Sequence, residues 1–332
     1  MAWALFAFSS AIIVYAAMQL SRYGDVIALR TGIGGMAVGT FLLAGVTSLP
    51  ELLMLGNSLA SGLPELAVGN LLGSNMFNML LLAVLDLAHQ RRILRSASAK
   101  HALPGALCVL MITLVVLFIG ADLPWAIKVG SWSVGVDSLV IIAAYVGAAR
   151  LLRNQSRFTP LPTEPELIPE GLPGLWPAVV GFTLSGALLV IVTPWLVSAS
   201  EEIAVITGLG TTFIGTTLVA MVTSLPELAT TLSAARIGAD DMAIANLFGS
   251  NMFNMLLVGV ADLFLIGSHF IGLIDNSFLL VGLFGLLMTI VALIGNLARL
   301  EKRLFFIEID AALLIIIYFG GMALLYSRGI AP

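Results

Sequence analysis

Two glutamates, Glu51 and Glu227, stand inside apolar segments, and each closes the same motif, Thr-Ser-Leu-Pro-Glu. A carboxylate in a segment that crosses a bilayer costs at least about 2.5 to 3.5 kcal/mol, so it must pair, take up a proton or face a polar cavity. Neither glutamate has a basic residue nearby in its segment. A bound cation is therefore the natural counter-charge.

Other oxygen-bearing side chains recur beside each glutamate at helical spacing. Thr47 lies four residues before Glu51, and Asn70, Ser74 and Asn78 follow one another at the same interval on the next segment. The equivalent residues of the second segment pair are Thr223, Glu227, Asn246, Ser250 and Asn254.

Backbone oxygens add to this set of possible ligands. Pro50 and Pro226 lack an N–H, and their rings obstruct the carbonyls of Val46 and Val222, which frees these oxygens beside each glutamate. Gly73 and Gly249 permit a helix break or a close helix approach. Carboxylate, amide, hydroxyl and carbonyl oxygens suit hard cations, and Ca²⁺ takes six to eight of them.

A purely structural role competes for several of these polar residues. Asn75 and Asn251 are interpreted as interhelical hydrogen-bond contacts, and Asn70 and Asn246 fit packing and binding equally well. The repeated acids Asp86 and Asp262 lie at segment ends and are interpreted as interfacial caps. His89, His101 and His269 also lie at segment ends, where a solvated loop role is expected.

Composition places these motifs in a membrane. The chain has 332 residues, of which 59% are hydrophobic and 10% charged, and its mean hydropathy is +1.07. Soluble domains contain about 25% charged residues. Apolar runs long enough to cross a bilayer as helices recur along the chain, and they do not alternate as barrel strands do. We predict ten spans: 3–20, 33–56, 63–87, 102–121, 134–152, 175–198, 209–233, 241–265, 278–297 and 304–326.

The distribution of Lys and Arg predicts the topology. If the odd-numbered spans run inward, 13 of the 15 basic residues lie on the cytoplasmic side, and only Lys128 and Arg328 lie outside. The positive-inside rule then places both termini outside the plasma (inner) membrane of a prokaryote.

The chain is a duplication with a constant offset of 176 residues. From residue 31 to 86, 29 of 56 positions are identical to their partners 176 residues later. The period contains five spans, an odd number, so the two copies cross the membrane in opposite directions, as in secondary transporters. The predicted fold is an all-α polytopic membrane protein of ten helices in two inverted five-helix repeats, over residues 1–157 and 175–332. A Pro-rich cytoplasmic linker, 158–174, joins them.

The duplicated motifs resemble those of the cation/Ca²⁺ exchanger superfamily, in particular its short prokaryotic Na⁺/Ca²⁺ exchanger-like members. The resemblance rests on Thr47-Ser-Leu-Pro-Glu51 with Asn70 to Asn78, and on the second copy from Thr223 to Asn254. These segments match the two α-repeats of that family, at about 39–86 and 215–262.

The resemblance implies an alternating-access antiporter whose spans 1 and 6 slide across a rigid core. It implies that Glu51 and Glu227 are the principal Ca²⁺ and Na⁺ ligands and that Asn78 and Asn254 face the same site. The further Na⁺ ligands it implies are Thr47, Ser48, Ser74, Thr223, Ser224 and Ser250, with the backbone carbonyls of Ala44 and Ala220.

Two positions depart from the family pattern. Val46 and Val222 precede the Thr-Ser pairs where the family usually has Gly, and Asn254 replaces an Asp that many Na⁺/Ca²⁺ exchangers carry opposite Asn78. The site then holds two carboxylates, which can neutralise one Ca²⁺ or two Na⁺, or titrate with protons. Na⁺/Ca²⁺ exchange is the leading hypothesis, and H⁺-coupled or K⁺-linked cation exchange is the alternative.

Other function classes fit the sequence less well. An inverted repeat within one chain favours alternating access over a cation channel. The chain lacks the His-Glu-x-x-His and Gly-x-Ser-x-Gly motifs of metalloproteases and serine hydrolases, so we expect no enzyme. The expected partners are inorganic cations and the lipid bilayer, with no nucleic acid, no obligatory protein partner and no cofactor. Ca²⁺ and Na⁺ would be bound only as cargo.

Overall fold

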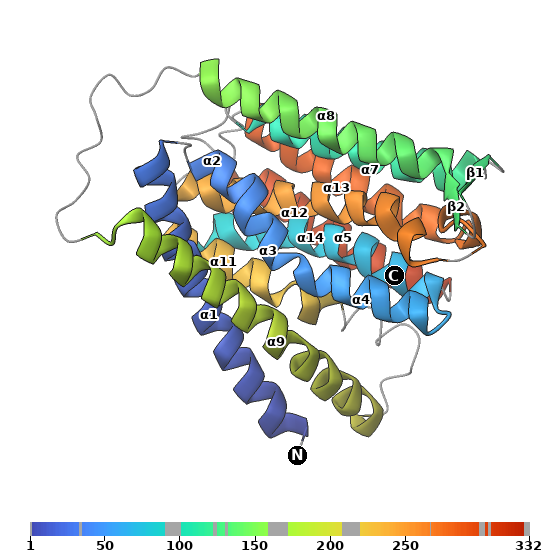
Figure 1. The fold of residues 1–332 in the computed structure, drawn as a ribbon, viewed down its shortest axis with the longest axis horizontal. Coiled ribbons are helices and arrows are strands. Elements are labelled where there is room, and N and C mark those ends of the chain that lie inside the picture. Colours follow the sequence, from blue (N-terminus) through green and yellow to red (C-terminus); the bar gives the residue numbers. More distant parts are fainter. Residues whose placement is uncertain are drawn as a thin grey trace.

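The structure is a computed structural model whose described residues form a bundle of long helices (Figure 1). They are residues 2–32, 35–89, 101–121, 125–129, 132–158, 172–207, 220–265, 267–298, 303–304 and 307–328. The helices of the first half are α1 (Ala2–Thr31), α2 (Gly35–Ala37), the π-helix η1 (Val38–Leu43), α3 (Ala44–Thr47), α4 (Leu49–Ala60), α5 (Pro64–His89), α7 (Ala102–Ala121) and α8 (Val136–Phe158).

The second half repeats this order. Its helices are α9 (Leu175–Thr207), α11 (Leu225–Arg236), α12 (Asp240–Val260), the short 3₁₀ helices η2 (Ala261–Phe264) and η3 (Ile271–Leu273), α13 (Phe278–Ala298) and α14 (Ile309–Ser327). Two antiparallel hairpins join helices, β1 (Ala126–Val129) with β2 (Trp132–Gly135), and β3 (Arg303–Leu304) with β4 (Ile307–Glu308).

The described helices account for eight of the ten predicted membrane spans by length and hydropathy. Seven are long and apolar enough to cross a bilayer, and the bent pair Val38–Thr47 with Leu49–Ala60 makes an eighth. The predicted span 134–152 lies largely in α8, whose Arg150 and Arg153 make it more polar. Of the predicted span 209–233, residues 209–219 lie outside the described residues, as does most of the predicted linker. The protein is an all-α membrane protein with the ten-span inverted-repeat architecture.

Helix packing follows the duplication. The helices α5 and α12 cross at the centre of the bundle, and their side chains are the most completely buried (Figure 1). Each contacts its own repeat's partner and the equivalent helices of the other repeat: α5 packs on α13 and α14, and α12 packs on α7 and α8. The outward-facing side chains are large and apolar, as lipid contact requires; Trp176 and Ile316 are examples.

The helices α1 and α9 lie side by side at the edge of this core (Figure 1). They run antiparallel, and the Arg30 guanidinium at the end of α1 donates hydrogen bonds to the carbonyls of Leu172 (3.0 Å) and Pro173 (3.2 Å), just before α9. These two hydrogen bonds fix one end of the pair.

Several helices extend beyond the predicted spans. The helix of the first span continues to Thr31, past residue 20, and α9 continues to Thr207, although its candidate span, Leu175–Ala199, agrees with the predicted 175–198. The tenth begins at Ile309, because residues 303–304 and 307–308 pair as strands. Hydropathy windows detect the apolar part of a helix, and these helices continue beyond it through polar turns.

A buried carboxylate anchors the first hairpin. Asp262 is 1% exposed, and its side chain accepts hydrogen bonds from the backbone N–H groups of Gly135 (2.7 Å) and Phe270 (2.6 Å). Asp262 therefore ties the end of α12 to the chain segment that leads into α8. This role is more specific than an interfacial cap, and only the pairing of distant segments reveals it.

Candidate cation-binding site

The two glutamates lie at matching breaks in two helices. The helix from Val38 bends by 40° before Leu49, and the break falls at Ser48, two residues before Pro50. Ser224, before Pro226, has the same backbone conformation. Glu51 and Glu227 therefore occupy the first turns of α4 and α11, where free N–H groups and the helix dipole favour a negative charge.

The two carboxylates accept hydrogen bonds from hydroxyl groups, partly across the repeats. Ser48 Oγ lies 3.1 Å from Glu227 Oε1, and Ser224 Oγ lies 3.5 Å from Glu51 Oε1. Ser250 Oγ is also 3.5 Å from Glu227 Oε1. Each repeat thus supplies a serine to the glutamate of the other repeat, so the site exists only when both halves are folded together.

Four asparagines form a second layer where α5 crosses α12. Asn78 Nδ2 donates to Asn251 Oδ1 (2.9 Å), and Asn254 Nδ2 donates to Asn75 Oδ1 (3.0 Å). Asn251 Nδ2 donates to the backbone carbonyl of Asn75 (3.3 Å). All four side chains are at most 1% exposed.

Five oxygens at or beside the carboxylates are buried and have no hydrogen-bond partner among the described residues. They are Glu51 Oε2, Glu227 Oε2, Ser74 Oγ, Asn78 Oδ1 and Asn254 Oδ1. Buried polar atoms normally have partners, because an unsatisfied one costs about 1 to 3 kcal/mol. Two of these oxygens belong to carboxylates whose partners, within the described residues, are hydroxyl groups and no cationic side chain. Such a donor set suits a hard cation.

The structure brings the other predicted ligands to the same region. Thr47 Oγ1 lies 3.5 Å from Ser250 Oγ, and Thr223 Oγ1 donates to Asn70 Oδ1 (3.2 Å). The carbonyls of Ala44 and Ala220 accept the backbone N–H groups of Ser48 and Ser224 at 3.0 and 3.1 Å. The hydroxyls of Thr47 and Thr223 also donate to these two carbonyls, at 3.4 and 3.1 Å.

Asn246 is placed differently from its repeat partner. Its amide donates to Thr231 Oγ1 at 3.1 Å, within its own repeat, whereas Asn70 binds Thr223 of the other repeat. The sequence favours packing and binding equally for both asparagines, and the structure gives them different hydrogen-bond partners.

Of the two roles expected for the repeated glycines, the structure shows close approach. The helices α5 and α12 run unbroken through Gly73 and Gly249, and the helix breaks lie at the serines. An added Cβ at Gly249 would lie 2.5 Å from the Thr40 carbonyl oxygen and 2.8 Å from Ala44 Cβ. The expectation that His101 faces solvent is wrong. His101 is fully buried, and its Nε2 lies 3.1 Å from Asp241 Oδ1, so it joins the starts of α7 and α12 instead of facing solvent.

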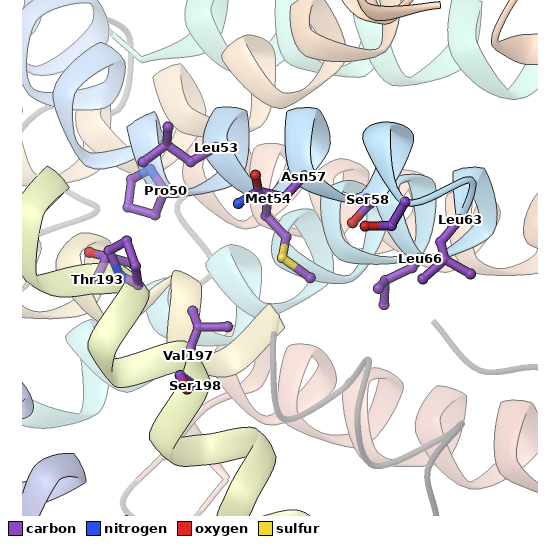
Figure 2. Close-up of a pocket in the computed structure, with 12 residues that line it drawn as sticks. Pro50, Leu53, Met54, Asn57, Ser58, Leu63, Leu66, Thr193, Val197 and Ser198 are labelled. Carbon is purple, nitrogen blue, oxygen red and sulfur yellow. The ribbon is translucent and has the colours of Figure 1, made fainter.

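A cavity of about 330 Å³ leads toward the site between α4 and α9 (Figure 2). Pro50, the neighbour of Glu51, lines one end, and Leu63, beyond the end of α4, lines the other. The Met54 and Val197 side chains extend into the space between the two helices (Figure 2). The cavity therefore gives solvent a route along α4 to the first turn that carries Glu51.

Asn75 and Asn251 make the interhelical hydrogen bonds that the sequence predicts for them, because each joins α5 to α12. Their partners are the amides of Asn254 and Asn78, which the sequence does not specify.

Comparison with known proteins gives a consistent result. Residues 1–151 and 177–327 match the family described as sodium/calcium exchanger protein. The putative antiporter CaxA of Alkalimonas amylolytica is 30% identical over 327 residues, which cover 95% of this chain and 96% of that protein. The sodium/calcium exchanger MaX1 of Methanosarcina acetivorans is 48% identical over 82 residues, which cover 24% of this chain and 23% of that protein.

The fold also matches solved structures. A structure of the sodium-calcium exchanger NCX_Mj superposes with a TM-score of 0.72 at 20% sequence identity, covering 97% of each chain. At this level of identity the match supports the fold and does not by itself identify the transported ion.

Proposed function

The chain belongs to the sodium/calcium exchanger protein family, a family of cation antiporters and not of enzymes, and from this premise we propose that it exchanges Na⁺ for Ca²⁺ by alternating access. Na⁺ would enter along its gradient while Ca²⁺ leaves. Glu51 and Glu227 would bind either cargo in turn, together with the hydroxyl, amide and carbonyl oxygens that surround them. The reaction is competition for one binding site.

The five buried, unpartnered oxygens around the two glutamates carry this proposal. Two ionised carboxylates here repel one another, and no cationic side chain of the described residues pairs with them, so the site needs bound cations or protons. One Ca²⁺ or two Na⁺ would neutralise both charges. That equivalence is the physical basis for exchange, because either cargo can satisfy the same oxygens.

Alternating access is supported by one asymmetry between the repeats. The helix α1 packs closely along α11, but its repeat equivalent α9 makes few contacts with α4, the equivalent of α11. The cavity fills that gap. By the positive-inside topology this gap faces outward, so the described conformation would be open outside and closed inside. Sliding of the α1–α9 pair would exchange the two arrangements.

We further propose that the protein lies in the plasma membrane of a prokaryote with both termini outside. The distribution of Lys and Arg supports this orientation. The proposed units are the two inverted repeats, 1–157 and 175–332, with the α-repeats 39–86 and 215–262 forming the site. The helix α8 ends at Phe158, one residue into the proposed linker.

The decisive experiment is counter-transport in proteoliposomes. Under an imposed Na⁺ gradient, the purified protein should drive uptake of radioactive Ca²⁺, with Mn²⁺, K⁺ and H⁺ tested as competing cargoes. Uptake that follows a pH gradient and ignores Na⁺ would establish the H⁺-coupled alternative. Uncoupled single-channel currents would replace the antiporter with a channel.

The site assignment has its own test. Glu51→Gln and Glu227→Gln each remove one of the two charges and should each abolish Na⁺-driven Ca²⁺ flux, by at least about a hundredfold, since a buried charge pair with a divalent ion is worth several kcal/mol. Thr113→Ala, on the exposed side of α7, controls for expression and reconstitution. Normal flux in both glutamine variants would disprove the assignment.

A further inference from the structure

The asparagine layer beneath the carboxylates is not symmetric, although its four residues are related by the repeat. Asn251 has both ends of its amide engaged: Nδ2 donates to the Asn75 backbone carbonyl at 3.3 Å, and Oδ1 accepts from Asn78 at 2.9 Å. Asn75 uses its Oδ1 to accept from Asn254 at 3.0 Å, while its Nδ2 has no partner among the residues that the structure describes.

The bond from Asn251 to the main chain fixes the direction of its amide. A backbone carbonyl can only accept, so the group facing Asn75 must be the NH₂ of Asn251. The opposite end of that amide is then an oxygen, and it faces residue 78. Only a donor satisfies this oxygen, and Asn78 supplies its NH₂. The Asn78 oxygen is left buried and without a partner, free for a cation.

Position 254 experiences a different constraint. The Asn75 amide lacks such an anchor, since its NH₂ group has no partner. A half-turn of this amide exchanges its oxygen and nitrogen and would present a donor to residue 254 in place of an acceptor. A carboxylate at position 254 would then be stabilised by a hydrogen bond, whereas a carboxylate at position 78 would face the fixed oxygen of Asn251.

We propose that Asn251 and Asn75 are positioning residues that decide where the site accepts extra negative charge: Asn251 requires an amide at position 78, and Asn75 accepts either an amide or a carboxylate at position 254. The inference rests on the proposed cation exchange, because it concerns the charge of that site.

The first test compares Asn78→Asp with Asn254→Asp, two identical chemical changes at equivalent positions. Melting temperatures are measured on purified, ion-free protein in detergent at neutral pH. We expect Asn254→Asp to melt within about 2 °C of wild type and Asn78→Asp to melt at least about 5 °C lower or to fail to accumulate. Equal effects of the two substitutions would overturn the proposal.

The second test asks whether Asn251 causes the difference. Asn251→Ala removes the fixed oxygen, so the double variant Asn251→Ala with Asn78→Asp should recover stability or expression relative to Asn78→Asp alone. Asn75→Ala with Asn78→Asp, the matched control, should not recover. A double variant that is no better than Asn78→Asp would show that residue 78 is sensitive for another reason, and would also overturn the proposal.

Ion binding separates this inference from the proposed function. Calorimetric titration with Ca²⁺ and with Na⁺ should show Asn254→Asp binding Ca²⁺ about tenfold more tightly than wild type, since a third carboxylate adds attraction for a divalent ion. If neither ion binds wild-type protein, the proposed function fails, while the melting temperatures still decide the role of the asparagines. If both ions bind and the two Asp variants behave alike, only the asparagine inference fails.

Discussion

The Ser48 hydroxyl lies 3.1 Å from Glu227 Oε1, while the equivalent distance from Ser224 to Glu51 is 3.5 Å. Glu227 also has Ser250 as a neighbour, whereas Ser74, the equivalent of Ser250, has no partner. The two halves of the site are therefore unequal at the level of single hydroxyls. Glu227 thus accepts hydrogen bonds from two serine hydroxyls and Glu51 from one.

We predict that Ser48→Ala weakens Na⁺ binding more than Ser224→Ala does. A hydrogen bond to a charged group is worth about 1.5 to 3 kcal/mol, so losing the shorter one should raise the Na⁺ concentration for half-maximal exchange about tenfold or more. The measurement is Na⁺-dependent Ca²⁺ efflux from proteoliposomes, with Thr113→Ala as the control. Equal half-maximal Na⁺ concentrations for the two serine variants would contradict the predicted difference between the two hydroxyls.

At the scale of helices, the crossing of α12 over the π-helix η1 depends on small residues. A Cβ at Gly39 would lie 2.5 Å from the Met242 carbonyl oxygen, and one at Gly249 would lie 2.5 Å from that of Thr40. Close approach of helix backbones through Gly is a common packing mode in membranes. It places Ser250 beside Thr47, at 3.5 Å between the hydroxyl oxygens.

Gly249→Ala should therefore destabilise the fold. Overpacking against a backbone atom costs about 1 to 3 kcal/mol, which corresponds to a melting temperature lower by about 2 to 10 °C in detergent. The control is Gly147→Ala on α8, where an added Cβ has no atom within 4 Å, so its melting temperature should stay at or above that of wild type. Equal stability of both variants would contradict the packing.

The closed side of the bundle has a hydrogen bond that the open side lacks. Ser21 on α1 donates to the Thr230 carbonyl on α11 at 2.8 Å. The residues 176 positions away are Val197 and Met54, which line the cavity between α9 and α4. If the α1–α9 pair slides, Val197 would pack on Met54 as the Ser21 bond breaks. One side is thus closed by a hydrogen bond and the other by apolar contact.

Ser21→Ala should shift the equilibrium toward the state in which α1 leaves α11. One net hydrogen bond, about 0.5 to 1.5 kcal/mol, corresponds to a two- to tenfold change in population. A cysteine in place of Thr230, labelled with an impermeant thiol reagent in inside-out vesicles, should react faster by that factor. Ser9→Ala is the matched control, because Ser9 is equally buried on α1 and its hydroxyl bonds within its own helix. Unchanged labelling would contradict this gate.

At the scale of the whole molecule, the orientation of the chain in the membrane decides which gate faces the cytoplasm. The hairpin of β1 and β2 should lie outside, and the end of α8 should lie in the cytoplasm. In intact cells, an impermeant thiol reagent should label Lys128→Cys and should label Arg153→Cys only after permeabilisation. Both positions are exposed in the structure, and the native Cys108 is buried. The opposite pattern would invert the topology and exchange the outer and inner gates.

The sequence alone determined the membrane class and the duplication, and it predicted the principal site residues. The sequence shows them because an ionised carboxylate in an apolar span is energetically costly. Glu51 and Glu227 are therefore expected to have a function. A repeat with 29 identities in 56 positions then doubles every such signal. The fold followed from the same duplication, since five spans per copy force inversion.

Only the tertiary structure decided which groups meet. Pro50 in the sequence indicates that its helix loses a backbone hydrogen bond. The position of the break at Ser48 and its bend of 40° depend on packing against α12. The bonds from Ser48 to Glu227, from Asn78 to Asn251 and from His101 to Asp241 join residues more than 130 positions apart. Periodicity gives the face on which a side chain lies, and the crossing of two helices decides what that face touches.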